Sequence, residues 1–183
     1  RGLGDVYKRQ GTYSAKIKTI LDNIDKVEGI VLVYSQYLDS GLVPIALALE
    51  EMGFTRAKQG NLLAPSSNRP SKRSTYAMIT GDIQHSVHAQ EELKLLNQEK
   101  NIHGDLCKVV LISQAGSEGI DFKNLRQVHI LEPWYNLNRI DQIIGRAIRN
   151  CSHRQLPLQK RNCQIFLHGS TTSMDIECVD LMM

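Results

Sequence analysis

Two arginines one helical turn apart are the side chains of this sequence best suited to holding an anion. The stretch Asp141-Gln-Ile-Ile-Gly-Arg-Ala-Ile-Arg149 places four residues at offsets of three, four and seven, on one face of a helix: Gln142, Gly145, Arg146 and Arg149. Two guanidinium groups at that spacing repel each other, so the pair favours a bound anion, and phosphate oxygens accept their forked donors well. A glycine inside a helix costs about 1 kcal/mol relative to alanine, which indicates that something approaches the backbone closely at Gly145.

This pattern resembles motif VI of superfamily 2 helicases and translocases, Q-x-x-G-R-x-x-R. The resemblance implies that Arg146 and Arg149 reach across a cleft to the γ-phosphate of ATP as arginine fingers. It also implies that Gln142 orients water or an arginine, and that Gly145 lies at the nucleotide. The structural alternative is a salt bridge from these arginines to Asp141 or Glu132.

The stretch Leu111-Ile-Ser-Gln-Ala-Gly-Ser-Glu-Gly-Ile-Asp-Phe122 resembles motif V of the same superfamily. Its glycines let main-chain amides approach a ligand after a buried strand, and Asp121 adds a carboxylate. The resemblance implies that Ser113, Gln114 and Gly116 contact a phosphate of the nucleic-acid backbone. It also implies that Gly119 and Asp121 lie near the ribose and phosphates of ATP. An ordinary strand-to-helix turn is the alternative. Chromatin-remodelling translocases typically have asparagine where Asp121 stands, so the branch of the superfamily stays open.

A third stretch, Gly29-Ile-Val-Leu-Val-Tyr-Ser-Gln36, resembles motif IV. Ser35 and Gln36 follow its apolar run, where they could donate to a backbone phosphate or only cap the next turn. The three motifs occur in family order, at spacings that suit one RecA-like domain, and the resemblance covers roughly residues 14 to 170. The residues after motif VI, from Asn150 to Leu167, look like superfamily 2 proteins of large nucleocytoplasmic DNA viruses, including poxvirus nucleoside-triphosphate phosphohydrolase relatives.

Strands and helices alternate along the chain. Apolar, often β-branched runs predict strands at 30–34, 76–80, 109–113, 128–131 and 163–167. Helical periodicity predicts helices at 14–26, opened by Ser14, and at 41–52, 88–99, 138–150 and 173–181. This alternation predicts an α/β fold, a RecA-like parallel sheet with helices on both faces, whose working loops lie beyond the carboxyl ends of the strands.

The chain has 183 residues, which is long enough to bury one hydrophobic core without disulfides, and its net charge is +3. Basic residues gather in two places, between Arg56 and Arg73 and between Arg139 and Arg161, which fits a polyanionic partner or merely a solvated surface. Four cysteines without C-x-x-C spacing predict reduced thiols, and Cys151 with His153 is too small a set for a zinc site. No apolar run is long enough to span a membrane, so we expect a soluble intracellular protein, in host cytoplasm or virion if viral.

The stretch Asp5-Val-Tyr-Lys-Arg-Gln10 matches one reading frame of a common transposon sequencing adapter. We therefore expect residues 1–10 to be an artefact, with a genuine flexible tail as the alternative. Residues 11–183 are then one helicase C-terminal RecA-like domain with an exposed basic insertion at about 58–74. If the segment is an artefact, the natural protein extends further toward its N-terminus.

Two motifs of complete helicases are not found in the sequence, the G-x-x-x-x-G-K-[ST] phosphate loop and the D-E-x-[DH] box. We therefore expect the Mg²⁺ ligands to come from an N-terminal RecA-like domain of the same protein, and the fragment alone to be inactive toward ATP. The expected partners are ATP, that domain and DNA or RNA. The alternative function is a non-catalytic nucleic-acid-binding or scaffold module. A free-standing nucleotide-binding protein is a second alternative, which is disfavoured because no glycine-rich turn follows the first strand.

Overall fold

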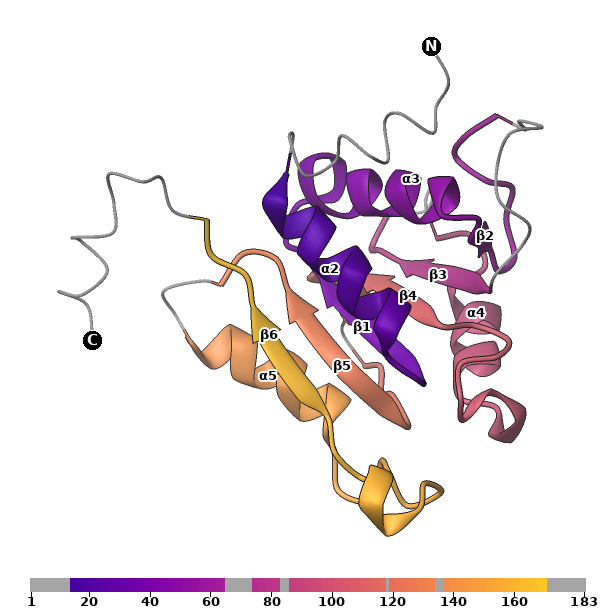
Figure 1. The fold of residues 1–183 in the computed structure, drawn as a ribbon, viewed down its shortest axis with the longest axis vertical. Helices are drawn as coiled ribbons and strands as arrows, with labels where there is room; N and C mark the ends of the chain where they lie inside the picture. Colours follow the sequence, from indigo (N-terminus) through magenta and orange to yellow (C-terminus); the bar gives the residue numbers. More distant parts are fainter. Residues whose placement is uncertain (1–13, 65–73, 83–85, 118, 134–136, 171–183) are drawn as a thin grey trace, which may run out of the picture.

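A six-stranded, wholly parallel sheet organises the computed structural model, which describes residues 14–64, 74–82, 86–117, 119–133 and 137–170. The strand order is β2-β3-β4-β1-β5-β6 (Figure 1). The strands are β1 (Ile30–Tyr34), β2 (Thr55–Arg56), β3 (Thr75–Ile79), β4 (Val109–Ile112), β5 (Leu125–Ile130) and β6 (Gln164–Leu167). The predicted α/β parallel sheet is confirmed, because every strand pair is parallel.

Helices cover both faces of the sheet, as predicted. Helices α2 (Ala15–Lys26) and α3 (Val43–Glu51) pack on one face, and α4 (Ala89–Leu96) and α5 (Leu137–Ala147) on the other (Figure 1). Four short helical turns complete the structure: η1 (Leu38–Leu42), η2 (Glu99–Asn101), η3 (Ala115–Ser117) and η4 (Leu158–Lys160). Side chains of β1 alternate between the two faces, so Val31 and Val33 pack under α2 and α3 while Leu32 packs on the opposite side.

Helix α2 begins where the sequence predicts. Ser14 precedes it in an extended conformation, and its Oγ accepts the Ile17 N–H at 3.3 Å. The apolar residues of α2, Ile20, Leu21 and Ile24, are buried in the hydrophobic core between α2, α3 and the sheet.

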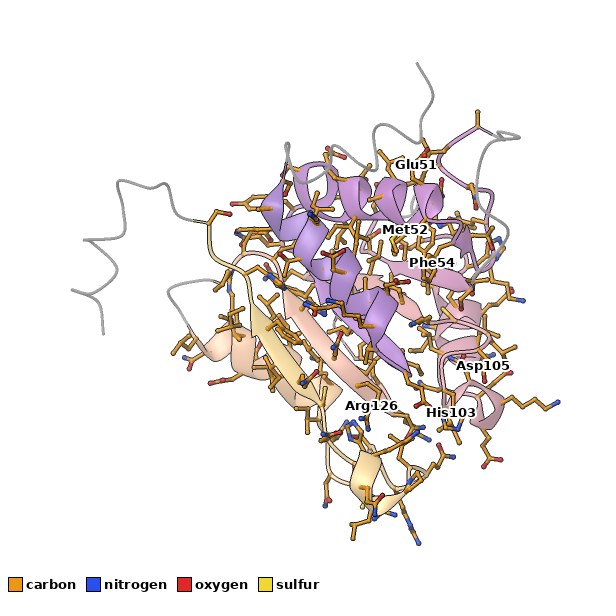
Figure 2. The ribbon with its side chains drawn as sticks, in the orientation of Figure 1. Glu51, Met52, Phe54, His103, Asp105 and Arg126 are labelled. Atoms are coloured by element: carbon orange, nitrogen blue, oxygen red, sulfur yellow. The ribbon has the colours of Figure 1, made fainter. Side chains whose placement is uncertain are left out.

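Several element boundaries differ from the predictions. Helix α3 starts two residues late because a π-helical turn, η1, precedes it, and α5 ends at Ala147 rather than at residue 150. Strand β5 begins at Leu125, three residues early, because its first residues include the polar Arg126 and Gln127, which hide the strand pattern. Phe54 is a buried core residue that directly precedes the two-residue strand β2, which the sequence pattern did not predict (Figure 2).

The basic insertion is described only up to residue 64, and most of residues 58–64 are exposed, as predicted. The fully buried carboxylate of Glu50 fixes its start by accepting the N–H groups of Leu62 at 2.8 Å and Leu63 at 2.7 Å, and the hydroxyl of Tyr76 at 2.7 Å. Three predictions lie outside the described residues: the terminal segment 1–10, insertion residues 65–73 and the helix at 173–181.

Candidate functional site

The ends of three neighbouring strands form a pocket at the carboxyl edge of the sheet. Strands β3, β4 and β1 are adjacent and parallel, so the residues that follow them meet at one edge. The pocket has a volume of about 400 Å³ and is lined by Gln36, Leu38, Thr80, Gly81, Asp82, Ser113, Gln114 and Ala115. The structure therefore brings together Gln36 from motif IV with Ser113 and Gln114 from motif V. We name this the carboxyl-edge pocket.

Ser35 is buried and is not among the described residues that line this pocket. Its side chain is fully buried, and its hydroxyl donates to Glu132 Oε2 at 2.8 Å and accepts the Tyr37 N–H at 3.0 Å. A Cβ built on Gly41 would lie 2.0 Å from Ser35 Oγ, so the turn packs tightly against it. Ser35 thus caps the following turn, and a direct contact from it to a phosphate stays a prediction.

Two glycines allow the loops after β3 and β4 to touch. A Cβ on Gly116 would lie 2.1 Å from the carbonyl oxygen of Ile79, and a Cβ on Gly81 would lie 2.3 Å from Cβ of Ala115. The Gly116 N–H donates to Ser113 Oγ at 3.2 Å. Gly116 is therefore needed first for contact between two loops of the protein, a role that the sequence pattern alone did not distinguish from access by a ligand.

The arginines of motif VI lie against the second half of motif V. Arg149 Nη1 forms an ion pair with Oδ2 of Asp121. The side chain of Arg149 is 64 % exposed and that of Asp121 is 50 % exposed. Arg146 donates from Nη1 to the carbonyl of Ile120 at 3.4 Å. The Arg149 guanidinium beside Asp121 holds the pKa of that carboxyl below its ordinary value. Arg149 therefore pairs with a carboxylate other than the two weighed from the sequence, and neither arginine is buried in the core.

The remaining predicted nucleotide contacts present open surface. Gln142 and Gly145 are exposed on α5, and a Cβ built on Gly145 would meet no atom within 4 Å. Gly119 has a φ of +71°, a conformation that favours glycine, and a Cβ there would also meet nothing. The chain itself does not require close packing at either glycine, which leaves both backbones accessible.

The predicted site residues thus form two groups. One group is the carboxyl-edge pocket. The other consists of Arg146 and Arg149 with residues 120–121, and we name it the arginine face. They are separate because α5 runs back along the sheet after β5, so that Arg146 lies beside Phe122, just before β5 begins; the Phe122 N–H donates to the Arg146 carbonyl at 3.4 Å.

Sequence reasoning missed Thr80 and Asp82 as lining residues. The signal that could have identified them is the polar Thr-Gly-Asp at the end of the predicted strand 76–80, because the carboxyl ends of parallel strands carry the working loops. The aromatic pair Trp134 and Tyr135, between motifs V and VI in the sequence, lies outside the described residues.

Much of the second basic stretch serves the fold. Lys160 pairs with Glu28 at 2.8 Å, and Arg161 donates to the carbonyls of Leu156 at 2.8 Å and Arg154 at 3.0 Å. In the first stretch, Arg56 is 8 % exposed and Lys58 lies 3.9 Å from Glu91. The two stretches are therefore not uniform cationic surfaces.

Metal ligands do not gather in the described part of the chain, where no group of three or more His, Cys, Asp or Glu side chains is placed to hold an ion. Both ring nitrogens of His153 have partners, Ser152 Oγ at 2.8 Å and the Leu125 carbonyl at 2.6 Å. Among the helices described, none combines the length and apolar character needed to cross a bilayer.

Known proteins share both the sequence pattern and the fold. Residues 15–151 match the family described as "Helicase conserved C-terminal domain". A termination factor NPH-I homolog of African swine fever virus is 34 % identical, over 86 % of this chain and 26 % of its own length. A protein of Acanthamoeba polyphaga mimivirus, named as an ATP-dependent RNA helicase, is 33 % identical over 85 % of this chain and 26 % of its own length.

The C-terminal part of the Fun30 ATPase domain has a similar fold, with a TM-score of 0.57 and 18 % identity, covering 90 % of this chain and 43 % of that one. The chain spans about a quarter of the length of the viral relatives that it matches. The parallel RecA-like sheet, three motifs in order and a family match over most of the sequence agree, and the chain belongs to the helicase C-terminal domain family.

Proposed function

We propose that this chain is the second RecA-like domain of an ATP-dependent nucleic-acid helicase or translocase. The observation that carries the proposal is the exposed Arg149 on α5, paired with Asp121 of motif V and one turn from Arg146. Two cationic forks on an open helix face can stabilise a transferring phosphoryl group when a second domain presents ATP to them.

The carboxyl-edge pocket is the proposed track for the nucleic-acid backbone. Its polar lining is mostly uncharged, from Gln36, Thr80, Ser113 and Gln114. Hydroxyl and amide groups contact backbone phosphates and position a strand without reading its bases. Such contacts suit a protein that must release each nucleotide in order to move along the strand.

The arginine face is the proposed contribution to ATP hydrolysis. In this conformation Asp121 forms an ion pair with the guanidinium of Arg149. A γ-phosphate must therefore compete with that carboxylate for Arg149 as the cleft between the domains closes. Gln142 and the exposed backbone at Gly119 and Gly145 would then border the nucleotide. The Mg²⁺ ligands and the phosphate loop would come from the first RecA-like domain of the complete protein.

A substitution of Arg149 in the complete polypeptide tests this proposal. Arg149→Gln should lower nucleic-acid-stimulated ATP turnover by roughly 10³-fold or more, because arginine fingers contribute about 10³ to 10⁵ in rate. Arg154→Gln, at another exposed arginine, is the matched control and should leave turnover near the wild-type rate. Retained turnover in Arg149→Gln would refute the finger assignment and favour a non-catalytic binding module.

A further inference from the structure

A second pocket lies at the opposite, amino edge of the sheet. It has a volume of about 400 Å³ and lies where β1, β5 and β6 begin, beside the end of α2 and the turn η4. Its acidic and basic lining residues are Lys26, Glu28, His103, Arg126 and Lys160. We name it the amino-edge pocket. None of its residues contributes to the carboxyl-edge pocket or to the arginine face.

Positive charge exceeds negative charge in this pocket. Glu28 is the one carboxylate in its lining, and it already pairs with Lys160 at 2.8 Å and with His103 at 3.3 Å. Lys26 and Arg126 therefore add two positive charges that the lining does not balance. A pocket with surplus cationic groups on several walls attracts a multivalent anion more strongly than a singly charged one.

Arg126 is held at this pocket by the backbone of Gly29. A Cβ built on Gly29 would lie 2.4 Å from Cγ of Arg126, and Gly29 has a φ of +110°. The glycine thus lets the arginine stem fold across the start of β1, and Figure 2 shows Arg126 and His103 at the same end of the sheet. The Nη1 atom of Arg126 is shielded from solvent and has no hydrogen-bond partner in the described structure.

A buried donor without an acceptor destabilises the structure that contains it. A modest rotation of the guanidinium toward an oxyanion in the pocket would supply the missing acceptor. A phosphate offers more acceptor oxygens and more charge than a carboxylate, and it accepts the two parallel N–H groups of a guanidinium fork.

We propose that the amino-edge pocket binds a multivalent phosphate anion through Arg126, Lys26 and Lys160. The site is independent of the function proposed above, since it shares no residue with either region that carries that function. Two features oppose binding, the Glu28 carboxylate and the carbonyl groups at the C-terminal end of α2. Glu28 therefore acts as an internal competitor that keeps the affinity moderate.

The test is a titration of the ¹⁵N-labelled chain with inorganic pyrophosphate. We expect the amide signals of Gly29, Arg126, Gln127 and Gln164 to shift in a saturable way. Arg126→Gln should weaken binding at these amides roughly tenfold or more, as expected for losing a charge-assisted hydrogen bond. Lys94→Gln, on the exposed face of α4, is the charge-matched control and should not change it.

Glu28→Gln separates binding from folding. Removing the competing carboxylate should strengthen pyrophosphate binding several-fold, although it also removes the tie to Lys160. A misfolded variant would lose binding instead, so opposite effects of Glu28→Gln and Arg126→Gln identify a real site. The absence of saturable shifts at these amides, or weaker binding by Glu28→Gln with its fold intact, would overturn the proposal.

A parallel titration with a short single-stranded oligonucleotide identifies the source of the phosphate. If the oligonucleotide shifts the same amides at lower concentration than pyrophosphate, the natural ligand is a nucleic-acid backbone. If pyrophosphate acts at lower concentration, the ligand is a free phosphate compound. Either result supports the site, and in both arms Arg126→Gln must weaken binding at these amides.

Discussion

The two pockets of this domain have the same volume, about 400 Å³, and lie at opposite edges of one sheet, yet their chemistry differs. The described lining of the carboxyl-edge pocket consists of hydroxyl and amide side chains, Gly81 and the apolar Leu38 and Ala115, with Asp82 as its one charged residue. The amino-edge pocket is lined by four basic side chains and one carboxylate. The contrast shows that one parallel sheet can carry a pocket with few charged residues at one edge and a mainly basic pocket at the other.

The two edges are also held together by different forces. At the carboxyl edge, the loops are fixed by a part-buried hydrogen bond from Ser35 to Glu132, residues 97 positions apart, and by glycine-dependent backbone contacts. At the amino edge, an exposed ion pair joins Glu28 to Lys160, residues 132 positions apart. Exposed ion pairs hold geometry weakly, so we expect the amino edge to adapt more readily to a ligand.

The largest expected effect on stability comes from filling the space at Gly116. Gly116→Ala would place a Cβ 2.1 Å from the Ile79 carbonyl oxygen, so the backbone must shift, and the free energy of unfolding should fall by roughly 1–3 kcal/mol. Chemical denaturation measures this change. Gly60→Ala, where a Cβ would meet nothing, is the control and should stay within about 0.5 kcal/mol of wild type. Equal stabilities of the two variants would contradict the tight loop contact.

Acid should loosen the β5–β6 side of the sheet before its centre. His129 is fully buried, and its Nδ1 lies 2.9 Å from Nε2 of His168. Burial, with the nearby His168, lowers the pKa of His129 to about 3. An unfolded histidine takes up its proton near pH 6.5, so the unfolded state binds more protons between those values. The free energy of unfolding should therefore fall as pH falls from about 6.5 toward 3, by at most about 1.4 kcal/mol per pH unit for this proton.

Hydrogen exchange measured from pH 7 to pH 4 checks this expectation, with β6 losing protection before β4. The His129→Gln variant keeps a polar side chain but removes the titrating group, so its unfolding free energy should depend less on pH. Uniform loss of protection in all strands of wild type would count against a local acid-sensitive cluster. Among the described residues that line the carboxyl-edge pocket there is no histidine, so we expect those residues not to share this response.

The smallest effect is expected at Gly145 and has the opposite sign. Gly145→Ala meets no neighbouring atom on α5 and should raise the free energy of unfolding by up to about 1 kcal/mol, the usual difference between these residues in a helix. Thermal denaturation of the chain measures it. A destabilised variant would show that the glycine serves packing rather than access to the helix surface.

The fold could be predicted because its central strands carry their own signal. The runs at 30–34 and 109–112 are buried on both faces and read as continuous apolar stretches. Strand β2 and the start of β5 could not be predicted in this way, because two residues make no pattern and Arg126 and Gln127 are polar. Their conformation follows from pairing with neighbours, β3 for β2 and β1 for β5.

The parts of the candidate site that could be predicted are those whose residues lie close together in the sequence. The residues of motifs V and VI each lie within about ten positions of sequence, so spacing alone groups them. The pairing of Arg149 with Asp121 and the assembly of the amino-edge pocket depend on contacts between distant segments. No local pattern encodes such contacts, and Glu28 and Lys160 meet only once the sheet has formed.

The central claim is that strand binding and ATP chemistry reside in different parts of this domain. The most direct measurement compares strand affinity and ATP turnover in the complete protein for Gln114→Ala and Arg149→Gln. We predict that Gln114→Ala weakens strand binding by roughly two- to tenfold, as for one neutral hydrogen bond, whereas Arg149→Gln abolishes turnover and leaves the strand bound. Loss of strand binding in Arg149→Gln, or full turnover in that variant, would contradict the division.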